Sequence, residues 1–175
     1  MKRLLIVVDM QVDFVDGALG SAEAEAIVPH VIEKIRAYEK AGDDVVFTLD
    51  THGEDYLDTL EGKNLPVKHC IKGTEGWKLT GALRQVAQGK KLFEKSTFGS
   101  PECAAYAAAG EYESIELVGL CTDICVISNA LLCKAYAKNT PVLVDAACCA
   151  GVTPKSHERA LAAMQSCQVE IYEGK

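Results

Sequence analysis

The sequence lacks two features that would point to membranes or nucleic acids as partners: a long apolar segment and an excess of positive charge. The apolar run that follows Arg3 stops at Asp9, and no segment approaches the roughly 20 consecutive apolar residues of a membrane-spanning helix. The net charge is −7, so nonspecific electrostatic attraction to nucleic acid or to an anionic membrane is not expected. We also expect no export signal, because the run breaks before any cleavage site. These absences predict a cytoplasmic protein that acts on small molecules.

Paired cysteine motifs that bind structural zinc are also missing, although the chain has eight cysteines. Cys121 and Cys125 are close in sequence, but no second pair has the same spacing, so a zinc finger or ribbon is not indicated. Cysteines of a cytoplasmic protein are expected to be reduced. We interpret most of them as small buried hydrophobic residues, with Cys125 as the exception.

What the sequence does contain is a regular alternation of short apolar runs and amphipathic segments. The runs are typical of buried strands, and the segments show the three-and-four spacing of helices. This order predicts a three-layer α/β/α, Rossmann-like fold with helices on both faces of a six-stranded, mainly parallel sheet, in a single domain over residues 1–175. The predicted strands cover 3–8, 44–49, 91–94, 115–120, 142–144 and 169–172. The predicted helices cover 25–41, 79–86, 101–109, 123–138 and 154–166.

Two segments and one proline carry further expectations. Residues 11–20 are predicted to form a loop, with glycines as its turn residues. Residues 51–76 form a long polar stretch without periodicity, and irregular segments of this length in a compact domain are usually functional. Pro29 lies in the predicted helix 25–41 and is expected in its first turn, because a proline further along removes a backbone hydrogen bond.

The stretch 118–126 combines a strand end, a turn and a helix start. The apolar run ends at Leu120, and helical spacing begins soon afterwards. Thr122 or Asp123 is expected to cap the helix by accepting from its first N–H groups. Cys125 then lies in the first helical turn, where the partial positive charge of the helix favours a thiolate and lowers the thiol pKa. This placement predicts a nucleophile.

Charged residues at other predicted strand ends supply partners for this thiol. Asp9, Asp50 and Lys95 all fall at carboxyl ends of predicted strands, where parallel sheets place their ligand sites. Asp9 can take the proton of Cys125, and Lys95 can hold both anions. The alternative is that these residues are unrelated: a turn aspartate, a solvated lysine and a core cysteine.

The segment after residue 49 contains a candidate metal site. Asp50 and His52 alternate at a strand end and therefore project to one side, while His69 and Glu61 lie further along the same polar stretch. Nitrogen and carboxylate ligands suit zinc, iron or manganese. The alternative reading is a pair of surface histidines in a polar loop.

Several short motifs, taken together and in order, resemble one family along the whole chain. They are LIVVDMQVDF at 5–14, GAL at 17–19, LDTH at 49–52, HCIKGTEG at 69–76, EKSTF at 94–98 and GLCTDICV at 119–126. The sequence resembles the isochorismatase-like cysteine hydrolases, and within them the nicotinamidase group. The resemblance implies hydrolysis of nicotinamide to nicotinate and ammonia through a cysteine thioester.

The resemblance also implies roles for individual residues. Asp9, Lys95 and Cys125 correspond to a catalytic triad. The backbone N–H groups of Cys121 and Cys125 correspond to an oxyanion hole, next to a cis peptide bond between Leu120 and Cys121. Members of this family tend to oligomerise, so a homo-oligomer is expected.

A divalent metal ion is implied as well, with zinc as the first choice and iron or manganese as alternatives. Asp50, His52 and His69 correspond to its ligands, and Glu61 stands where some relatives have a fourth. In the implied mechanism this ion orients the pyridine ring of the substrate. Phe14 is expected to contact that ring.

Some features depart from the family pattern and leave other functions open. No aromatic residue stands in the stretch 65–70, where the family often has one against the substrate ring, and Trp77 occupies a position where a small residue is common. One alternative is a metal-free amidohydrolase acting on N-carbamoyl or ureido compounds or on another small amide. A non-catalytic, thiol-rich binding protein is a second. His30 and His157 are interpreted as surface or structural residues.

Overall fold

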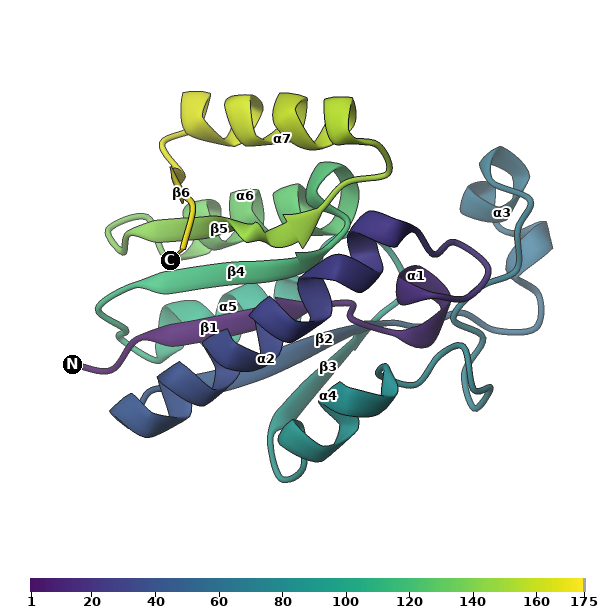
Figure 1. Cartoon of the computed structure of the whole chain (residues 1–175). Coiled ribbons are helices and arrows are strands. Elements are labelled where there is room, and N and C mark those ends of the chain that lie inside the picture. Colours follow the sequence, from purple (N-terminus) through teal and green to yellow (C-terminus); the bar gives the residue numbers. More distant parts are fainter. Residues whose placement is uncertain (175) are drawn as a thin grey trace.

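The structure, a computed structural model, describes residues 1–174 and contains a parallel six-stranded sheet with helices on both faces (Figure 1). The strand order is β3-β2-β1-β4-β5-β6, and every neighbouring pair is parallel. The predicted three-layer α/β/α fold is confirmed. The strands are β1 (Leu4–Val8), β2 (Asp44–Asp50), β3 (Lys91–Lys95), β4 (Ile115–Leu120), β5 (Val142–Ala150) and β6 (Glu170–Tyr172).

The helices divide into two layers. Helices α2 and α4 pack on one face of the sheet, while α5, α6 and α7 cover the other. The longer helices are α2 (Ala22–Ala41), α5 (Pro101–Ala109), α6 (Ile127–Tyr136) and α7 (Pro154–Ser166). The shorter ones are α1 (Val12–Val15), η1 (Tyr56–Asp58), α3 (Leu60–Asn64), α4 (Gly81–Val86) and the π-helical turn η2 (Thr122–Val126).

The central strand shows why the apolar runs of the sequence become buried strands. All residues of β1 are inaccessible to solvent. Leu4 and Ile6 pack into the core under α5, α6 and α7, whereas Leu5 and Val7 pack into the core under α2 and α4. Because successive side chains point to opposite faces, a strand covered on both sides must be apolar throughout.

The expectation for Pro29 is wrong. Helix α2 begins earlier than predicted, at Ala22, because Ser21 caps it by accepting a hydrogen bond from the Ala24 N–H at 3.1 Å. Pro29 therefore lies in the helix interior. Its position is exposed, and so is Glu25 one turn earlier, so the carbonyl that loses its partner can face water.

Other boundaries differ from the prediction for local reasons. Residues 11–20 include the short helix α1, and the stretch 51–76 includes η1 and α3. Strand β5 continues well past its predicted end at residue 144, because the buried Asp145 is paired with Lys34 at 2.7 Å and need not face solvent. In the part of the chain that is described, no helix combines the length and apolarity needed to cross a membrane.

We predict that Gly119→Ala destabilises the protein strongly. Gly119 has a φ of +117°, and a Cβ atom there would lie 2.2 Å from the Val8 carbonyl oxygen of the neighbouring strand. Backbone strain and the clash should together lower the free energy of unfolding by at least about 2 kcal/mol, measured by urea denaturation. Gly81→Ala is the control, because a Cβ at Gly81 meets nothing within 4 Å. Equal stability of the two variants would contradict the close approach of β1 and β4.

Candidate active site

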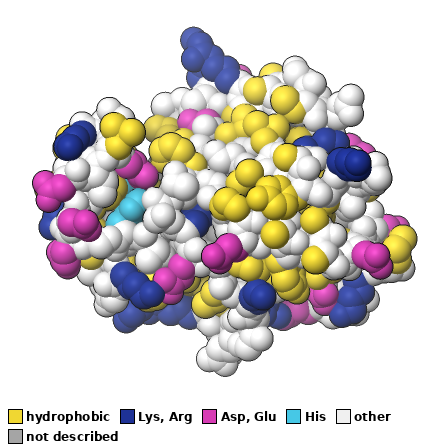
Figure 2. Space-filling view, turned by 180° about the vertical axis from the view of Figure 1, so that it is seen from behind, with side chains coloured by type: hydrophobic (Ala, Val, Ile, Leu, Met, Phe, Trp, Pro, Cys, Tyr) yellow, Lys and Arg dark blue, Asp and Glu magenta, His cyan; other side chains and the backbone are white. Residues whose placement is uncertain are grey.

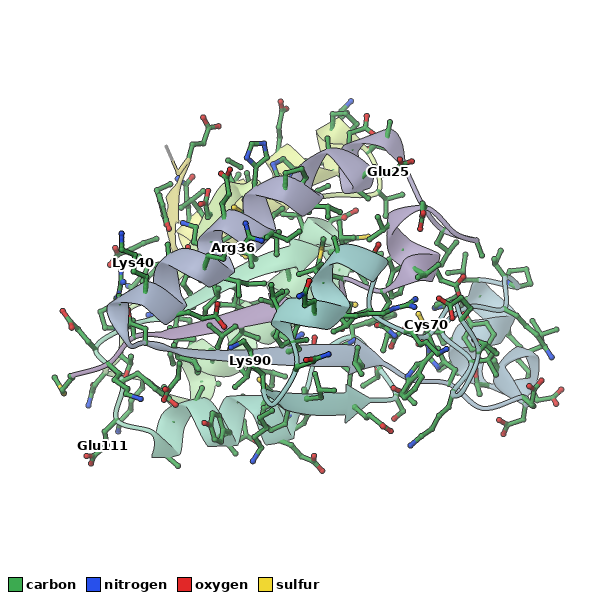
Figure 3. All side chains as sticks on the ribbon, turned by 60° about the horizontal axis from the view of Figure 1, so that its bottom comes forward. Glu25, Arg36, Lys40, Cys70, Lys90 and Glu111 are labelled. Carbon is green, nitrogen blue, oxygen red and sulfur yellow. The ribbon has the colours of Figure 1, made fainter. Side chains whose placement is uncertain are left out.

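The carboxyl ends of four neighbouring strands meet at one edge of the sheet and surround a cavity. Asp9 follows β1, Asp50 and Lys95 end β2 and β3, and Cys121 follows β4. The cavity has a volume of about 450 Å³. Figure 3 shows Cys70, which follows His69, among the dense side chains beyond these strand ends. The residues lining the cavity include Phe14, Leu19, Asp50, Glu61, Leu65, His69, Phe98, Cys121, Ile124, Cys125 and Val152.

The structure brings the predicted nucleophile, carboxylate and cation together. The Lys95 ammonium lies 2.6 Å from Asp9 Oδ2 and 3.5 Å from Cys125 Sγ. It also donates to the Thr97 carbonyl oxygen at 3.0 Å and lies 3.4 Å from Asp50 Oδ1. Asp9 has a second partner, because the Thr48 hydroxyl donates to its Oδ1 at 2.6 Å. Asp9, Lys95 and Cys125 are all buried, which argues against the reading of three unrelated residues.

Burial changes the charge expected on the thiol. It raises the pKa of Cys125 well above its usual value, and the Asp9 carboxylate raises it further, whereas Lys95 acts in the opposite direction without outweighing them. The expected lowering of the thiol pKa is therefore wrong. Burial also raises the pKa of Asp9, opposed by Lys95. Burial therefore favours the neutral form of the Cys125 thiol, and Lys95 is the neighbour that favours the thiolate.

The turn that carries Cys125 differs from the predicted helix start. Neither Thr122 nor Asp123 caps it, so that prediction is wrong. The Thr122 hydroxyl is paired with Nδ1 of His157 at 2.7 Å, and Asp123 accepts a hydrogen bond from the Val152 N–H at 3.0 Å. Both side chains are thus directed toward α7 and the segment before it. The turn is a π-helical segment that follows a cis peptide bond between residues 120 and 121, the bond implied by the family resemblance.

Backbone N–H groups lie beside the thiol. Within the described residues, the N–H groups of Cys121 and Cys125 have no acceptor among the turn, loop and cap hydrogen bonds. Both residues line the cavity. A carbonyl oxygen of a ligand near Cys125 Sγ would lie beside these N–H groups at a helix start, where negative charge is favoured.

Four potential metal ligands converge next to the triad. One ligand atom from each of Asp50, His52, Glu61 and His69 lies within 4.8 Å of the others. Nε2 of His52 and Nε2 of His69 lie 2.9 and 3.4 Å from Asp50 Oδ2, and 3.6 and 3.7 Å from Glu61 Oε1. The reading as unrelated surface histidines does not hold, because both histidines are buried.

The orientation of His69 fits a metal site. Its Nδ1 lies 2.7 Å from the Val67 carbonyl oxygen, so Nδ1–H donates there and the ring turns Nε2 toward Asp50 and Glu61. Although burial alone raises the pKa of Asp50, hydrogen bonds from His52 and His69 and the charge of Lys95 lower it below its usual range. Carboxylate oxygens and imidazole nitrogens together form a donor set that suits a divalent cation.

A second cavity reaches the same cluster from another side. Its volume is about 700 Å³, and its lining includes His52 and Thr97. The two cavities share four lining residues, which are Glu61, Leu65, Phe98 and Ile124. In Figure 2 part of a histidine side chain is visible within a hollow on the side of α3, with acidic side chains nearby.

The wall of the main cavity includes residues that sequence reasoning passed over. Phe14 lines it as expected, and its ring centroid lies 5.4 Å from that of His69. The stretch before His69 contains no aromatic residue to line the cavity. Phe98 and Leu65 form an apolar part of the cavity wall instead. Trp77 is not among the lining residues, and its indole N–H donates to the Thr51 hydroxyl at 2.9 Å. Phe98 ends the motif at 94–98. Its position just after a predicted strand could have indicated that it lies at the site.

The remaining cysteines behave as expected. Like Cys125, the other seven are free thiols, and most are buried in the two cores. Only Cys167 among them is exposed. Burial raises the pKa of Cys133 to about 12, which favours its protonated, less reactive form.

Comparison with known proteins gives matches over nearly the whole chain. The isochorismatase domain model matches residues 3–174. The uncharacterized isochorismatase family protein PncA of Bacillus subtilis (strain 168) is 32% identical over 174 residues, covering 92% of this chain and 93% of that protein.

Two solved structures match over nearly the whole chain. The nicotinamidase/pyrazinamidase PncA of Bacillus subtilis has a TM-score of 0.86 and 29% identity, covering 99% of this chain and 100% of that chain. The pyrazinamidase of Pyrococcus horikoshii in complex with zinc has the same TM-score and 27% identity, covering 99% and 100%. The match of the domain model to almost every residue, together with these relatives, shows that the chain belongs to the isochorismatase family.

Proposed function

We propose that the protein hydrolyses nicotinamide to nicotinate and ammonia, with Cys125 as the nucleophile. The observation that carries this proposal is the placement of a buried Cys125–Lys95–Asp9 triad and a four-ligand cluster around one cavity. Relatives described as nicotinamidase or pyrazinamidase support the choice of substrate. The metal-free ureido amidohydrolase is less favoured, because the ligand cluster would then have no use.

The first step is attack on the amide carbon. Asp9, as a carboxylate, takes the proton of the Cys125 thiol, while Lys95 stabilises the thiolate as it forms. The thiolate adds to the carbonyl carbon, and the N–H groups of Cys121 and Cys125 donate to the resulting oxyanion. Donors fixed in this way contribute about 3–4 kcal/mol each in other acyl-transfer enzymes.

The second half of the reaction uses the same groups in reverse roles. Protonated Asp9 gives its proton to the amide nitrogen, the C–N bond breaks and ammonia leaves. Asp9 then accepts a proton from a water molecule that attacks the thioester, and nicotinate is released as Cys125 is reprotonated. The raised pKa of Asp9 suits both roles, because the group gains and loses a proton in each cycle.

Asp50, His52, Glu61 and His69 would hold a divalent metal ion, for which we propose zinc. This donor set contains no thiolate and suits a borderline cation, and one structural relative is a pyrazinamidase in complex with zinc. When bound, such an ion supplies a Lewis-acidic position for the ring nitrogen of the substrate. Phe14 and Phe98 line the cavity and offer apolar contact to the ring. A homo-oligomer and a cytoplasmic location stay predictions.

Replacing the nucleophile tests the proposed reaction. Cys125→Ala should lower the rate of ammonia release from nicotinamide by at least about 10⁴-fold, because no other group can form the thioester. Thermal unfolding and metal content should stay close to those of the wild type. Cys133→Ala is the matched control, a buried cysteine of α6 outside the cavity. Residual turnover of Cys125→Ala near the wild-type rate would rule out Cys125 as the nucleophile.

The role of Asp9 predicts a specific pH dependence. The ionised form of Asp9 is the base, so kcat/KM should fall as the pH falls through its raised pKa. Thr48→Val removes a donor to that carboxylate and raises its pKa further, so the acid limb should move to higher pH by about one unit. Thr48→Ser keeps the hydroxyl and should leave the limb in place. The proposal for Asp9 fails if both variants give the wild-type profile.

The ligand cluster is tested by metal binding rather than by activity. Asp50→Ala should weaken zinc binding by more than about 100-fold, because it removes a direct ligand, whereas loss of supporting residues typically costs 10–100-fold. Equilibrium dialysis followed by elemental analysis measures this affinity. Asp55→Ala is the control, since Asp55 lies close in sequence but outside the cluster. Equal affinity of the two variants would exclude Asp50 as a ligand.

A further inference from the structure

Asn129 is a buried polar residue of α6 that the reaction above does not use. Only 2% of its surface is exposed. Its side-chain amide makes three hydrogen bonds, all with backbone groups. The carbonyl oxygen accepts from the Ser100 N–H at 2.9 Å, and the amide nitrogen donates to the carbonyl oxygens of Cys125 at 2.8 Å and Phe98 at 3.2 Å.

These bonds join two segments that are distant in sequence. Cys125 lies one helical turn before Asn129, in the turn that carries the nucleophile. Phe98 belongs to the segment that links Lys95 to α5. The same segment is tied to the triad from its other side, because the Lys95 ammonium donates to the Thr97 carbonyl oxygen and lies 3.5 Å from Cys125 Sγ. The segment after Lys95 is therefore connected to the Cys125 turn twice, once through Asn129 and once through the Lys95 ammonium.

The bonds of Asn129 are not required to start α5. Ser100 caps that helix with its own hydroxyl, which accepts from the Cys103 N–H at 3.1 Å. What Asn129 adds is a link across the two segments. A side chain without an amide would leave the Ser100 N–H and the Phe98 carbonyl oxygen without this partner in a buried environment, and the segment would have to move to satisfy them.

We propose that Asn129 is a positioning residue that sets the separation of Lys95 and Cys125 by clamping the segment 95–100 to the nucleophile turn. This inference rests on the proposed function, in which Cys125 is the nucleophile and Lys95 is the cation beside it. The clamp acts on the two partners whose contact allows a thiolate to form. It also fixes Phe98, which lines the cavity.

The chain offers a matched control one residue away. The Ser128 hydroxyl donates to the Ile124 carbonyl oxygen at 2.6 Å, a bond of the same kind as that from Asn129 to Cys125 but without a link to another segment. Ser128→Ala therefore removes a hydrogen bond to the same turn and leaves the clamp intact. Asn129→Ser keeps one bond and removes the link. A serine hydroxyl can donate to the carbonyl oxygen four residues earlier, that of Cys125, but it is too short to reach Phe98.

The test compares Asn129→Ala, Asn129→Ser and Ser128→Ala with the wild type. Ammonia release gives kcat and KM, and mass spectrometry of peptides after iodoacetamide treatment gives the alkylation rate of Cys125.

Both Asn129 variants should lower kcat about 10–100-fold, more than they change KM, because displacements of about 1 Å have effects of this size. They should also slow alkylation of Cys125 about tenfold, since the thiolate forms less readily away from Lys95. Ser128→Ala should stay within about twofold in both measurements, a change of only a few tenths of a kcal/mol.

Two results would overturn the clamp. One is an Asn129→Ser variant with wild-type kcat and an unchanged or faster alkylation of Cys125. The other is a Ser128→Ala variant that loses as much as Asn129→Ser, which would point to general loosening of the turn. If Asn129→Ala does not fold, Asn129→Ser decides. If the wild type releases no ammonia from nicotinamide, the proposed function fails, and the alkylation rates still decide the clamp.

Discussion

The site depends on one buried ammonium group. Lys95 contacts the Asp9 carboxylate, the Cys125 thiol, the Asp50 carboxylate and a backbone carbonyl oxygen within a region almost closed to solvent. Burial alone lowers the pKa of Lys95, but these neighbours outweigh it and raise that pKa, so the charge persists. Removing one partner of a buried pair typically costs 3–5 kcal/mol, because the other charge is left uncompensated. The nucleophile and the ligand cluster are joined through this group.

The sheet explains why these groups meet. Strands β1, β2 and β3 are parallel neighbours, so the residues at their carboxyl ends lie side by side: Asp9, Asp50 and Lys95. Strand β4 pairs with β1 on its other side and delivers the turn with Cys125. The backbone of β4 comes close to that of β1 at Gly119, where a Cβ would collide with the Val8 carbonyl. The geometry of the site therefore follows from packing at the sheet centre.

The sequence was sufficient to predict six parallel strands, because buried parallel strands are continuous apolar runs. It also predicted that Asp9, Asp50 and Lys95 lie together, because the carboxyl ends of parallel strands meet at one edge of the sheet. It was insufficient for Thr48 and Asn129, whose roles depend on partners distant in the chain. The prediction of a helix cap at residues 122–123 was wrong, because both side chains form hydrogen bonds with α7 or the segment before it. The sequence predicted a lowered pKa for the Cys125 thiol, whereas burial raises it. Depth of burial cannot be inferred from a local helix pattern.

The charge balance of the site has a consequence for folding. The Lys95 ammonium contacts the carboxylates of Asp9 and Asp50, and Glu61 adds a third carboxylate beside Asp50. In their ionised forms these three groups exceed the single ammonium by two negative charges. A divalent cation held by the folded chain would cancel that excess, and the unfolded chain has no such cluster. Folding and ion binding are then linked, and each tenfold rise in free ion above the dissociation constant adds about 1.4 kcal/mol to the free energy of unfolding. Chelation would thus weaken the fold itself.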